Sequence, residues 1–117
     1  MEILSESKPV AKKRHICDLC DCAIEKGTKY YRQANKDGSG EIRTFRAHTE
    51  CWELVDELDM FKECSRYDGI DNYFFQEFIN DYVGDNYPEK EREKLYSKPY
   101  YEMAKQILED ETLDSKR

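Results

Sequence analysis

The stretch HICDLCDCAI, residues 15–24, decides the fold of this chain, because it places three cysteines and a histidine within eight positions. Thiols at this density serve as a redox pair, as disulfide partners or as metal ligands. No stretch approaches the roughly 18 apolar residues of a membrane-spanning helix, and residues 1–8 lack the basic start and apolar run of a secretory signal. We therefore expect a cytoplasmic protein, in which thiols stay reduced unless they are catalytic or bind a metal.

A second pair of metal-ligating residues, His48 and Cys51, has the same spacing as Cys17 and Cys20. Two residues between the thiols let a short knuckle direct both sulfurs at one ion, and the second pair lies where a β-prone run changes to a helical pattern. Three thiolates and one imidazole form a closed, tetrahedral structural zinc site. We therefore predict one structural Zn²⁺, held by Cys17, Cys20, His48 and Cys51.

Other potential ligands receive different assignments. Cys22 is expected to be a spare thiol, although it stays open as a competing ligand, and His15 is expected to be a neighbouring imidazole. Cys64 follows Phe61 by three residues on the same helical face, which favours a small buried hydrophobe. Residues 15–52 offer few aliphatic side chains, so zinc, which contributes about 10–16 kcal/mol in finger peptides, would substitute for a core there.

The hydrophobic pattern predicts strands first and helices afterwards. Two β-prone runs, 28–34 and 41–47, flank a Gly- and Asn-containing turn and are typical of a hairpin. The stretch 65–70 is expected to interrupt the helical pattern, and Gly84 is expected to end a helix. Apolar residues at helical spacing predict helices over 48–64 and 71–83, and Pro88 and Pro99, which suit first-turn positions, predict helices over 88–96 and 99–111.

This order of knuckle, hairpin and helix, with the second ligand pair at the start of the helix, resembles the treble-clef zinc finger. The resemblance covers residues 14–64 and departs at Asp21-Cys22, because such knuckles often continue with Gly. The predicted fold class is therefore α+β, with a treble-clef-like zinc module at 14–64. A flexible basic tail at 1–13 is expected to precede the module, and an acidic, aromatic, α-helical region at 65–117 is expected to follow it.

Catalysis is not indicated. A treble clef can hold a ββα-metal nuclease site, which needs a catalytic histidine beside the hairpin and a free metal position. His48 is already used as a ligand, and residues 52–61 contain neither His nor Asn. No flanking sequence supports Cys22 with His15 as nucleophile and base, and a redox CDLC would be expected within a βαβ pattern. We expect a non-enzymatic protein.

The charge is distributed unevenly and bears on the choice of partner. Residues 1–52 carry 10 Lys and Arg against 8 Asp and Glu, whereas residues 53–117 carry 9 against 18, within a chain of net charge −7. An acidic half would be repelled by a phosphate backbone and favours protein partners with basic surfaces. The alternative is a nucleic-acid-binding zinc-finger regulator that uses the basic tail and the hairpin cations together with Tyr30, Tyr31 and Phe45.

Aromatic residues crowd the predicted helix 71–83 on more than one face, and Tyr is a favoured interface anchor. We therefore predict that a protein partner with a basic surface binds this helix. The expected contact residues are Asp71, Tyr73, Phe74, Glu77, Asp81 and Tyr82.

As a whole, this short acidic chain, rich in Lys, Glu, Tyr and Asn, resembles small phage-encoded zinc-finger proteins. Within that group it is similar to anti-CRISPR proteins of the type II kind, some of which bind zinc. The resemblance implies an inhibitor that binds an RNA-guided DNA-cleaving effector and blocks its DNA binding.

Overall fold

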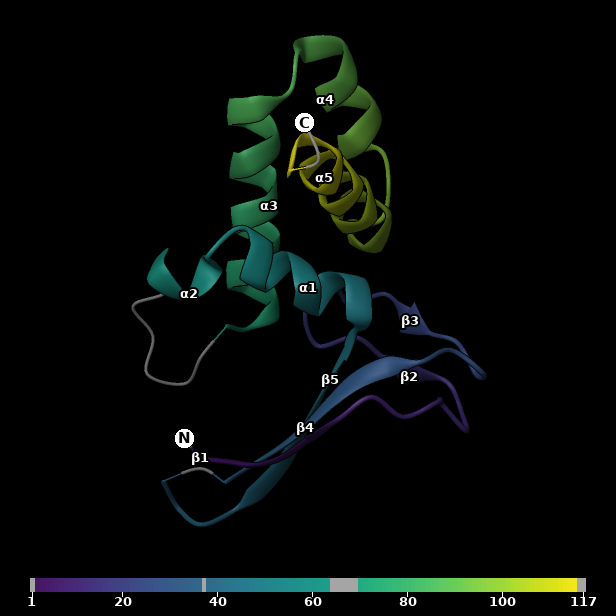
Figure 1. Cartoon of the computed structure of the whole chain (residues 1–117), viewed down its shortest axis with the longest axis vertical. Helices are drawn as coiled ribbons and strands as arrows, with labels where there is room; N and C mark the ends of the chain where they lie inside the picture. The colour runs from purple at the N-terminus through teal and green to yellow at the C-terminus, as the bar shows by residue number, and fades with distance from the viewer. Residues whose placement is uncertain (1, 37, 64–69, 116–117) are drawn as a thin grey trace.

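A computed structural model of the protein describes residues 2–36, 38–63 and 70–115 and shows a mixed α+β fold. Figure 1 shows the strands gathered at one end, α1 lying across them, and α3, α4 and α5 forming the other end. The elements are β1 (Glu2–Ser7), β2 (His15–Ile16), β3 (Ala23–Ile24), β4 (Tyr30–Lys36), β5 (Ile42–His48), α1 (Thr49–Glu57), α2 (Met60–Glu63), α3 (Asn72–Asn86), α4 (Glu89–Tyr96) and α5 (Tyr100–Ser115).

The predicted hairpin is present as β4 and β5, which pair antiparallel from Tyr30 opposite His48 to Lys36 opposite Ile42. A sheet of three strands has the order β1-β4-β5, and the short strands β2 and β3 form a separate pair. Trp52 of α1 stacks on Tyr31 of β4 with the ring centroids 4.3 Å apart. Helix α1 therefore covers the face of the sheet to which Tyr31 points.

The segment predicted as a flexible tail, 1–13, instead pairs with the hairpin over residues 2–7 and at Val10. Strand β1 runs antiparallel to β4, and the Tyr31 hydroxyl donates to Glu6 Oε1 at 2.6 Å. The chain stays beside the hairpin as far as Ala11, whose N–H donates to the carbonyl of Thr28 at 2.9 Å. Amino-acid composition predicted a tail because it describes only the residues of the segment itself. The strand forms because the free edge of β4, a distant part of the sequence, supplies hydrogen-bond partners to its backbone.

The predicted helix 48–64 is wrong in its continuity. Helix α1 ends at Glu57, Asp59 adopts a left-handed backbone with φ 50°, and α2 begins at Met60. Left-handed residues terminate helices because their N–H groups turn back to earlier carbonyls, as Asp59 N–H does to Asp56 at 3.2 Å. Cys64 and residues 65–69 of the predicted interruption at 65–70 lie outside the described residues.

Helix α3 corrects a second prediction, because it continues through Gly84 to Asn86. Asp71 caps its start and accepts a hydrogen bond from the N–H of Phe74 at 2.8 Å. A Cβ on Gly84 would lie 3.5 Å from the hydroxyl of Tyr96 on α4. This separation is an ordinary van der Waals contact, so Gly84 lies within α3 beside α4 and does not end the helix. The predicted helices at 88–96 and 99–111 are α4 and α5, and each begins one residue after its proline.

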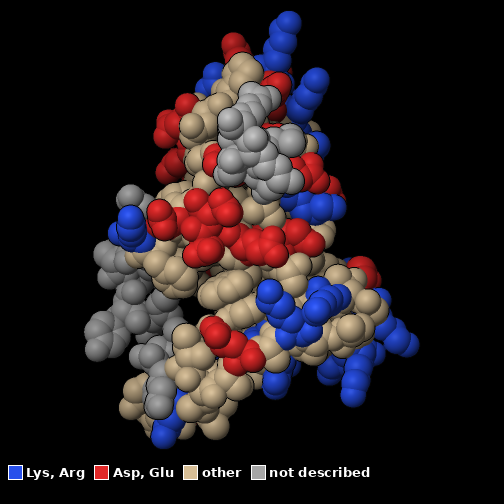
Figure 2. Space-filling view, in the orientation of Figure 1, with Lys and Arg blue, Asp and Glu red and all other residues tan. Residues whose placement is uncertain are grey.

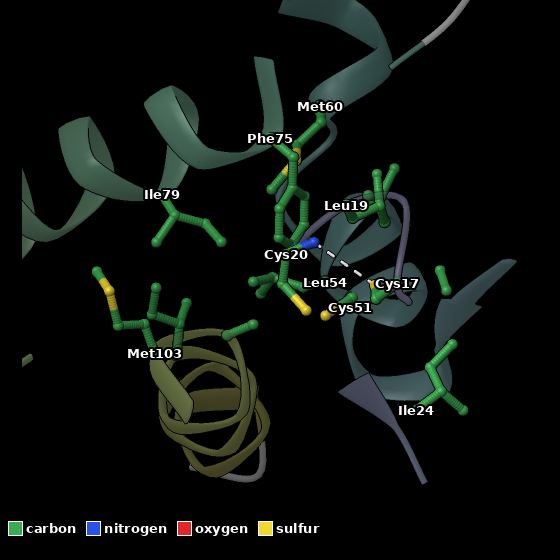
Figure 3. Packing of buried hydrophobic residues seen from close by; sticks show 14 of the residues in the cluster. Cys17, Leu19, Cys20, Ile24, Cys51, Leu54, Met60, Phe75, Ile79 and Met103 are labelled. Carbon is green, nitrogen blue, oxygen red and sulfur yellow. Dashed lines mark hydrogen bonds between the residues drawn. The ribbon is translucent and has the colours of Figure 1, made fainter. Parts of the chain in front are cut away.

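Buried side chains from the knuckle, the hairpin and all the longer helices form one hydrophobic cluster. Figure 3 shows Phe75 and Ile79 of α3, Met103 of α5 and the cysteines as parts of this cluster. The helices therefore share their core with the cysteine region. None of the helices in the described part of the chain combines the length and apolar character needed to cross a bilayer.

Candidate metal centre

The knuckle between β2 and β3 is shaped by backbone hydrogen bonds and one left-handed residue. Cys17 N–H donates to the carbonyl of Cys22 at 2.9 Å, and Asp21 N–H donates to the carbonyl of Cys17 at 3.1 Å. Asp21 has φ 62°, a conformation that Asp tolerates better than most residues and that closes the turn. The turn brings Cys20 back over Cys17, so that the N–H of Cys20 donates to Cys17 Sγ at 3.5 Å.

The second pair is presented by the junction of strand and helix. His48 is the last residue of β5 and the N-cap of α1, and Cys51 lies in the first turn of that helix. The N–H of His48 donates to Cys17 Sγ at 3.4 Å, which fixes the junction against the knuckle. One side chain thus comes from the strand end and one from the helix start, as the sequence predicted.

The four predicted ligands lie together: the ligand atoms of Cys17, Cys20, His48 and Cys51 are all within 4.8 Å of one another. All four residues are buried, with exposed fractions of 0%, 1%, 3% and 0%. Figure 3 shows the sulfurs of the three cysteines directed toward one another. Three sulfur donors and one imidazole nitrogen that converge in a closed space are compatible with a single structural metal ion.

The His48 ring is oriented by its two nitrogens. Nδ1 lies 3.3 Å from Cys20 Sγ and 3.9 Å from Cys51 Sγ, and Nε2 lies 2.9 Å from the carbonyl oxygen of Ala23. A carbonyl can only accept, so Nε2 carries the proton and Nδ1 is the nitrogen available to a metal. Strand β3 therefore acts as the outer partner that sets the tautomer of the ligand.

Tyr101 of α5 contacts the metal centre, and the sequence reasoning did not identify this residue. Its ring stacks on His48 with the centroids 3.8 Å apart and an interplanar angle of 22°. Its hydroxyl donates to Glu50 Oε2 at 3.1 Å, and burial followed by the charge of Glu50 raises the pKa of Tyr101. The two adjacent tyrosines at the start of α5 were the only local indication. The C-terminal helix is thereby fixed directly to one of the four candidate ligands.

Hydrogen bonds among the three thiols shift their pKa values in opposite directions. Cys17 accepts hydrogen bonds from the Cys20 and Cys51 thiols, and these bonds lower the pKa of Cys17 far below its usual range. The pKa values of Cys20 and Cys51 rise, because each donates to Cys17. Burial lowers the pKa of His48, but the hydrogen bond and charge of Cys17 outweigh this effect and leave it raised. A metal ion would displace these protons, so its affinity will depend on pH.

Cys22 and His15 stand outside the cluster of four. The half-buried Cys22 thiol donates to the carbonyl of Cys20 at 3.6 Å, and the His15 ring packs against Tyr30 with the centroids 5.5 Å apart. Burial, then Arg46 and Lys13, lower the pKa of His15. The structure thus gives both residues local contacts other than the metal cluster.

The residues predicted to bind a partner lie on α3 and at its N-cap. Asp71 is committed to capping the helix, and Tyr73 is 60% exposed. A groove runs along the helix, and the described residues that line it are Phe74, Glu77, Phe78, Asp81, Tyr82, Asp85 and Asn86. Four of the six predicted contact residues therefore line one surface, to which Phe78, Asp85 and Asn86 are additions that the sequence reasoning missed.

Comparison of the chain with known protein families, with curated proteins and with solved structures yields no match.

Proposed function

We propose that this protein is a non-enzymatic, zinc-stabilised docking module that binds a partner protein with a basic surface through α3. The observation that carries the proposal is the groove along α3, in which an aromatic row and an acidic row run side by side. Phe74, Phe78 and Tyr82 recur at intervals of four residues, and Glu77, Asp81 and Asp85 recur at the same interval. Both rows therefore follow one side of the helix.

The groove is separate from the part of α3 that builds the core. Phe75, Ile79 and Val83 form the inner face and are fully buried, with exposed fractions of 0%. The second aromatic row packs against the edge of this core and remains only half-buried. Aromatic rings flanked by carboxylates are suited to a partner segment that offers apolar side chains between Lys and Arg residues.

Zinc is the metal that the donor set supports best. Three thiolates and one imidazole are soft and borderline ligands, and four of them in a closed arrangement are typical of structural Zn²⁺. The order of knuckle, hairpin β4–β5 and helix α1 supports a treble-clef-like module. A site with four protein ligands has no position for substrate or activated water, which supports a structural role.

Partners with basic surfaces include the nucleic-acid channels of RNA-guided nucleases, which the resemblance to small phage-encoded inhibitors suggests. Bound in such a channel, the acidic rows of α3 would occupy the place of phosphates. The protein would then act as an inhibitor that prevents the effector from binding DNA. Steering by opposite charge predicts a fast association that slows as salt is added.

The experiment measures binding of purified RNA-guided nucleases to this protein and their retention of target DNA. Glu77→Lys with Asp81→Lys should weaken partner binding at least tenfold. The matched control, Glu53→Lys with Glu93→Lys, changes the net charge equally at exposed positions outside the groove and should have little effect. Equal losses in both pairs would mean that only net charge matters, and the α3 site would be wrong.

The metal requires its own measurement. Purified protein should contain one zinc per chain, and both double variants above should retain it. A protein that folds and binds its partner without any metal would contradict the proposed role of zinc.

A further inference from the structure

Two arginines oppose each other on the face of the sheet turned away from Trp52. Arg32 of β4 pairs with Arg46 of β5 in the antiparallel register, so their side chains leave the same face from adjacent strands. Tyr31 is the neighbour of Arg32 and points to the opposite face, where Trp52 stacks on it. Like charges directly opposite one another destabilise a sheet. An anion bound between them would remove this repulsion.

Neither guanidinium has a counter-ion in the part of the chain that the structure describes. No salt bridge joins Arg32 or Arg46 to a described carboxylate, and Nε of Arg46 is buried without a hydrogen-bond partner there. Asp18 Oδ2 accepts from the backbone N–H of Arg46 at 2.9 Å, and the charge of Arg46 acts on this carboxyl group without a side-chain hydrogen bond or salt bridge between the two. By contrast, Arg43 of the same strand faces the other side and pairs with Glu41 at 3.7 Å.

Further cations surround this pair. The His15 ring packs against Tyr30, which lies two residues before Arg32 and therefore on the same face of β4. Figure 2 shows Lys and Arg side chains gathered over the strands, whereas Asp and Glu side chains gather over α1. The exposed residues of α1 include Glu53, Asp56 and Glu57, and α1 covers the other face of the sheet. The acidic and basic surfaces are therefore divided between different sides of the hairpin.

We propose that the sheet face carrying Arg32 and Arg46 binds the phosphate backbone of single-stranded nucleic acid. Two guanidiniums on adjacent strands can each donate several hydrogen bonds to phosphate oxygens. Helix α1 packs on the opposite face, so this face presents strands and not a helix to nucleic acid. An extended single strand needs only a row of cations and a ring for stacking. The half-buried His15, beside the cationic cluster, supplies that ring.

This surface is distinct from the α3 groove in residues and in charge. The docking module of the previous subsection would contact a basic protein, and the sheet face would contact an anion. Both contacts suit a nucleoprotein partner, but each is tested by different variants. Loss of one contact leaves the other intact.

The test is fluorescence anisotropy of a labelled 12-nucleotide single strand, of DNA or of RNA, with the zinc-loaded full chain at 50–200 mM salt. Arg32→Gln and Arg46→Gln should each weaken binding and reduce the slope of log affinity against log salt by about 0.7, the value for one lost contact to a single strand. The matched control Arg43→Gln removes a cation from the opposite face of β5 and should leave the slope unchanged. Glu77→Lys on α3 should likewise not weaken binding.

Specific outcomes overturn the proposal. Absence of measurable binding at 50 mM salt would do so, and so would a loss in Arg43→Gln equal to that in Arg32→Gln. Displacement of the oligonucleotide by an equal concentration of phosphate groups, added as inorganic phosphate, would show an isolated anion site in place of a strand-binding surface. Zinc content and Trp52 emission verify folding; if Arg46→Gln does not fold, Arg32→Gln alone decides, because no described group pairs with its guanidinium.

Discussion

Tyr101 provides the sharpest test of how the helical end of the molecule is joined to the metal centre. Its ring lies 3.8 Å from His48, centroid to centroid, and its hydroxyl donates to Glu50 at 3.1 Å. Replacement by Phe removes only the hydroxyl, and replacement by Ala removes the hydroxyl and the ring. The pair of variants therefore separates the hydrogen bond from the stack.

The expected magnitudes follow from these contacts. The hydroxyl contributes about 1 kcal/mol, the net value of one hydrogen bond, so Tyr101→Phe should lower the free energy of unfolding by about that amount. A fully buried aromatic ring truncated to Ala costs about 3–5 kcal/mol. Tyr101 is half-buried, and its stack on His48 adds about 0.5–1.5 kcal/mol beyond area. We therefore expect a loss of about 2–3 kcal/mol for Tyr101→Ala.

Urea denaturation at a fixed concentration of free zinc measures both losses, with far-UV circular dichroism for the helices and fluorescence for the single tryptophan, Trp52. Trp52 directly follows the candidate ligand Cys51, so its emission is sensitive to changes at the candidate metal centre. Tyr101→Ala should also release zinc to a chromogenic chelator faster than the wild-type protein, whereas Tyr101→Phe should not. If the two variants were equally stable and released zinc at the same rate, the stack would contribute nothing, and α5 would be held by its other buried residues alone.

Other perturbations address the ligands, the helix junction and the response to base. Cys51→Ser should lose metal and helical structure together, because ligand bonds and folding share one free energy. The control Cys22→Ser should keep one zinc by elemental analysis. Retention of full zinc by Cys51→Ser would refute the ligand set. Asp59→Gly should raise the unfolding free energy by up to about 1 kcal/mol, because glycine adopts φ 50° without strain and the exposed ion pair with Lys62 contributes little. Thermal denaturation measures this change, and a lower melting temperature would contradict it. Burial raises the pKa of Tyr31 from 10 to about 12. The stability that comes from its protonated form is therefore fully present below pH 10 and is lost as pH rises through 12. A spectrophotometric titration compared with that of Tyr31→Phe should show one phenol that ionises near pH 12, and a midpoint near 10 would disprove this.

The sequence was sufficient for the parts of the site that depend on spacing. Two residues between ligands, in CDLC and again between His48 and Cys51, place paired donors on one turn whatever surrounds them. The hairpin between the pairs could be predicted because β-prone runs and a turn are local properties. The α+β class and the convergence of four ligands therefore required no knowledge of distant contacts.

The errors have a common physical cause. Strand β1 depends on a partner strand that is far away in the sequence. The end of α1 depends on the positive φ of Asp59. The continuation of α3 through Gly84 occurs beside Tyr96 of α4, which is also distant along the chain. Composition assigns residues 2–7 to a tail because it cannot show that β4 has a free edge. Periodicity joins α1 and α2 because apolar spacing continues across a residue with positive φ.

The amino-acid sequence by itself thus determined which residues converge as potential ligands, since that information lies in short spacings and in the chemistry of thiols and imidazole. Tertiary structure alone decided what surrounds them: the stack of Tyr101 on His48, the carbonyl of Ala23 at its Nε2, and the pairing of Arg32 with Arg46 on one sheet face. These contacts join residues that are far apart along the chain, and only the folded backbone determines which of many such pairs come within a few ångströms.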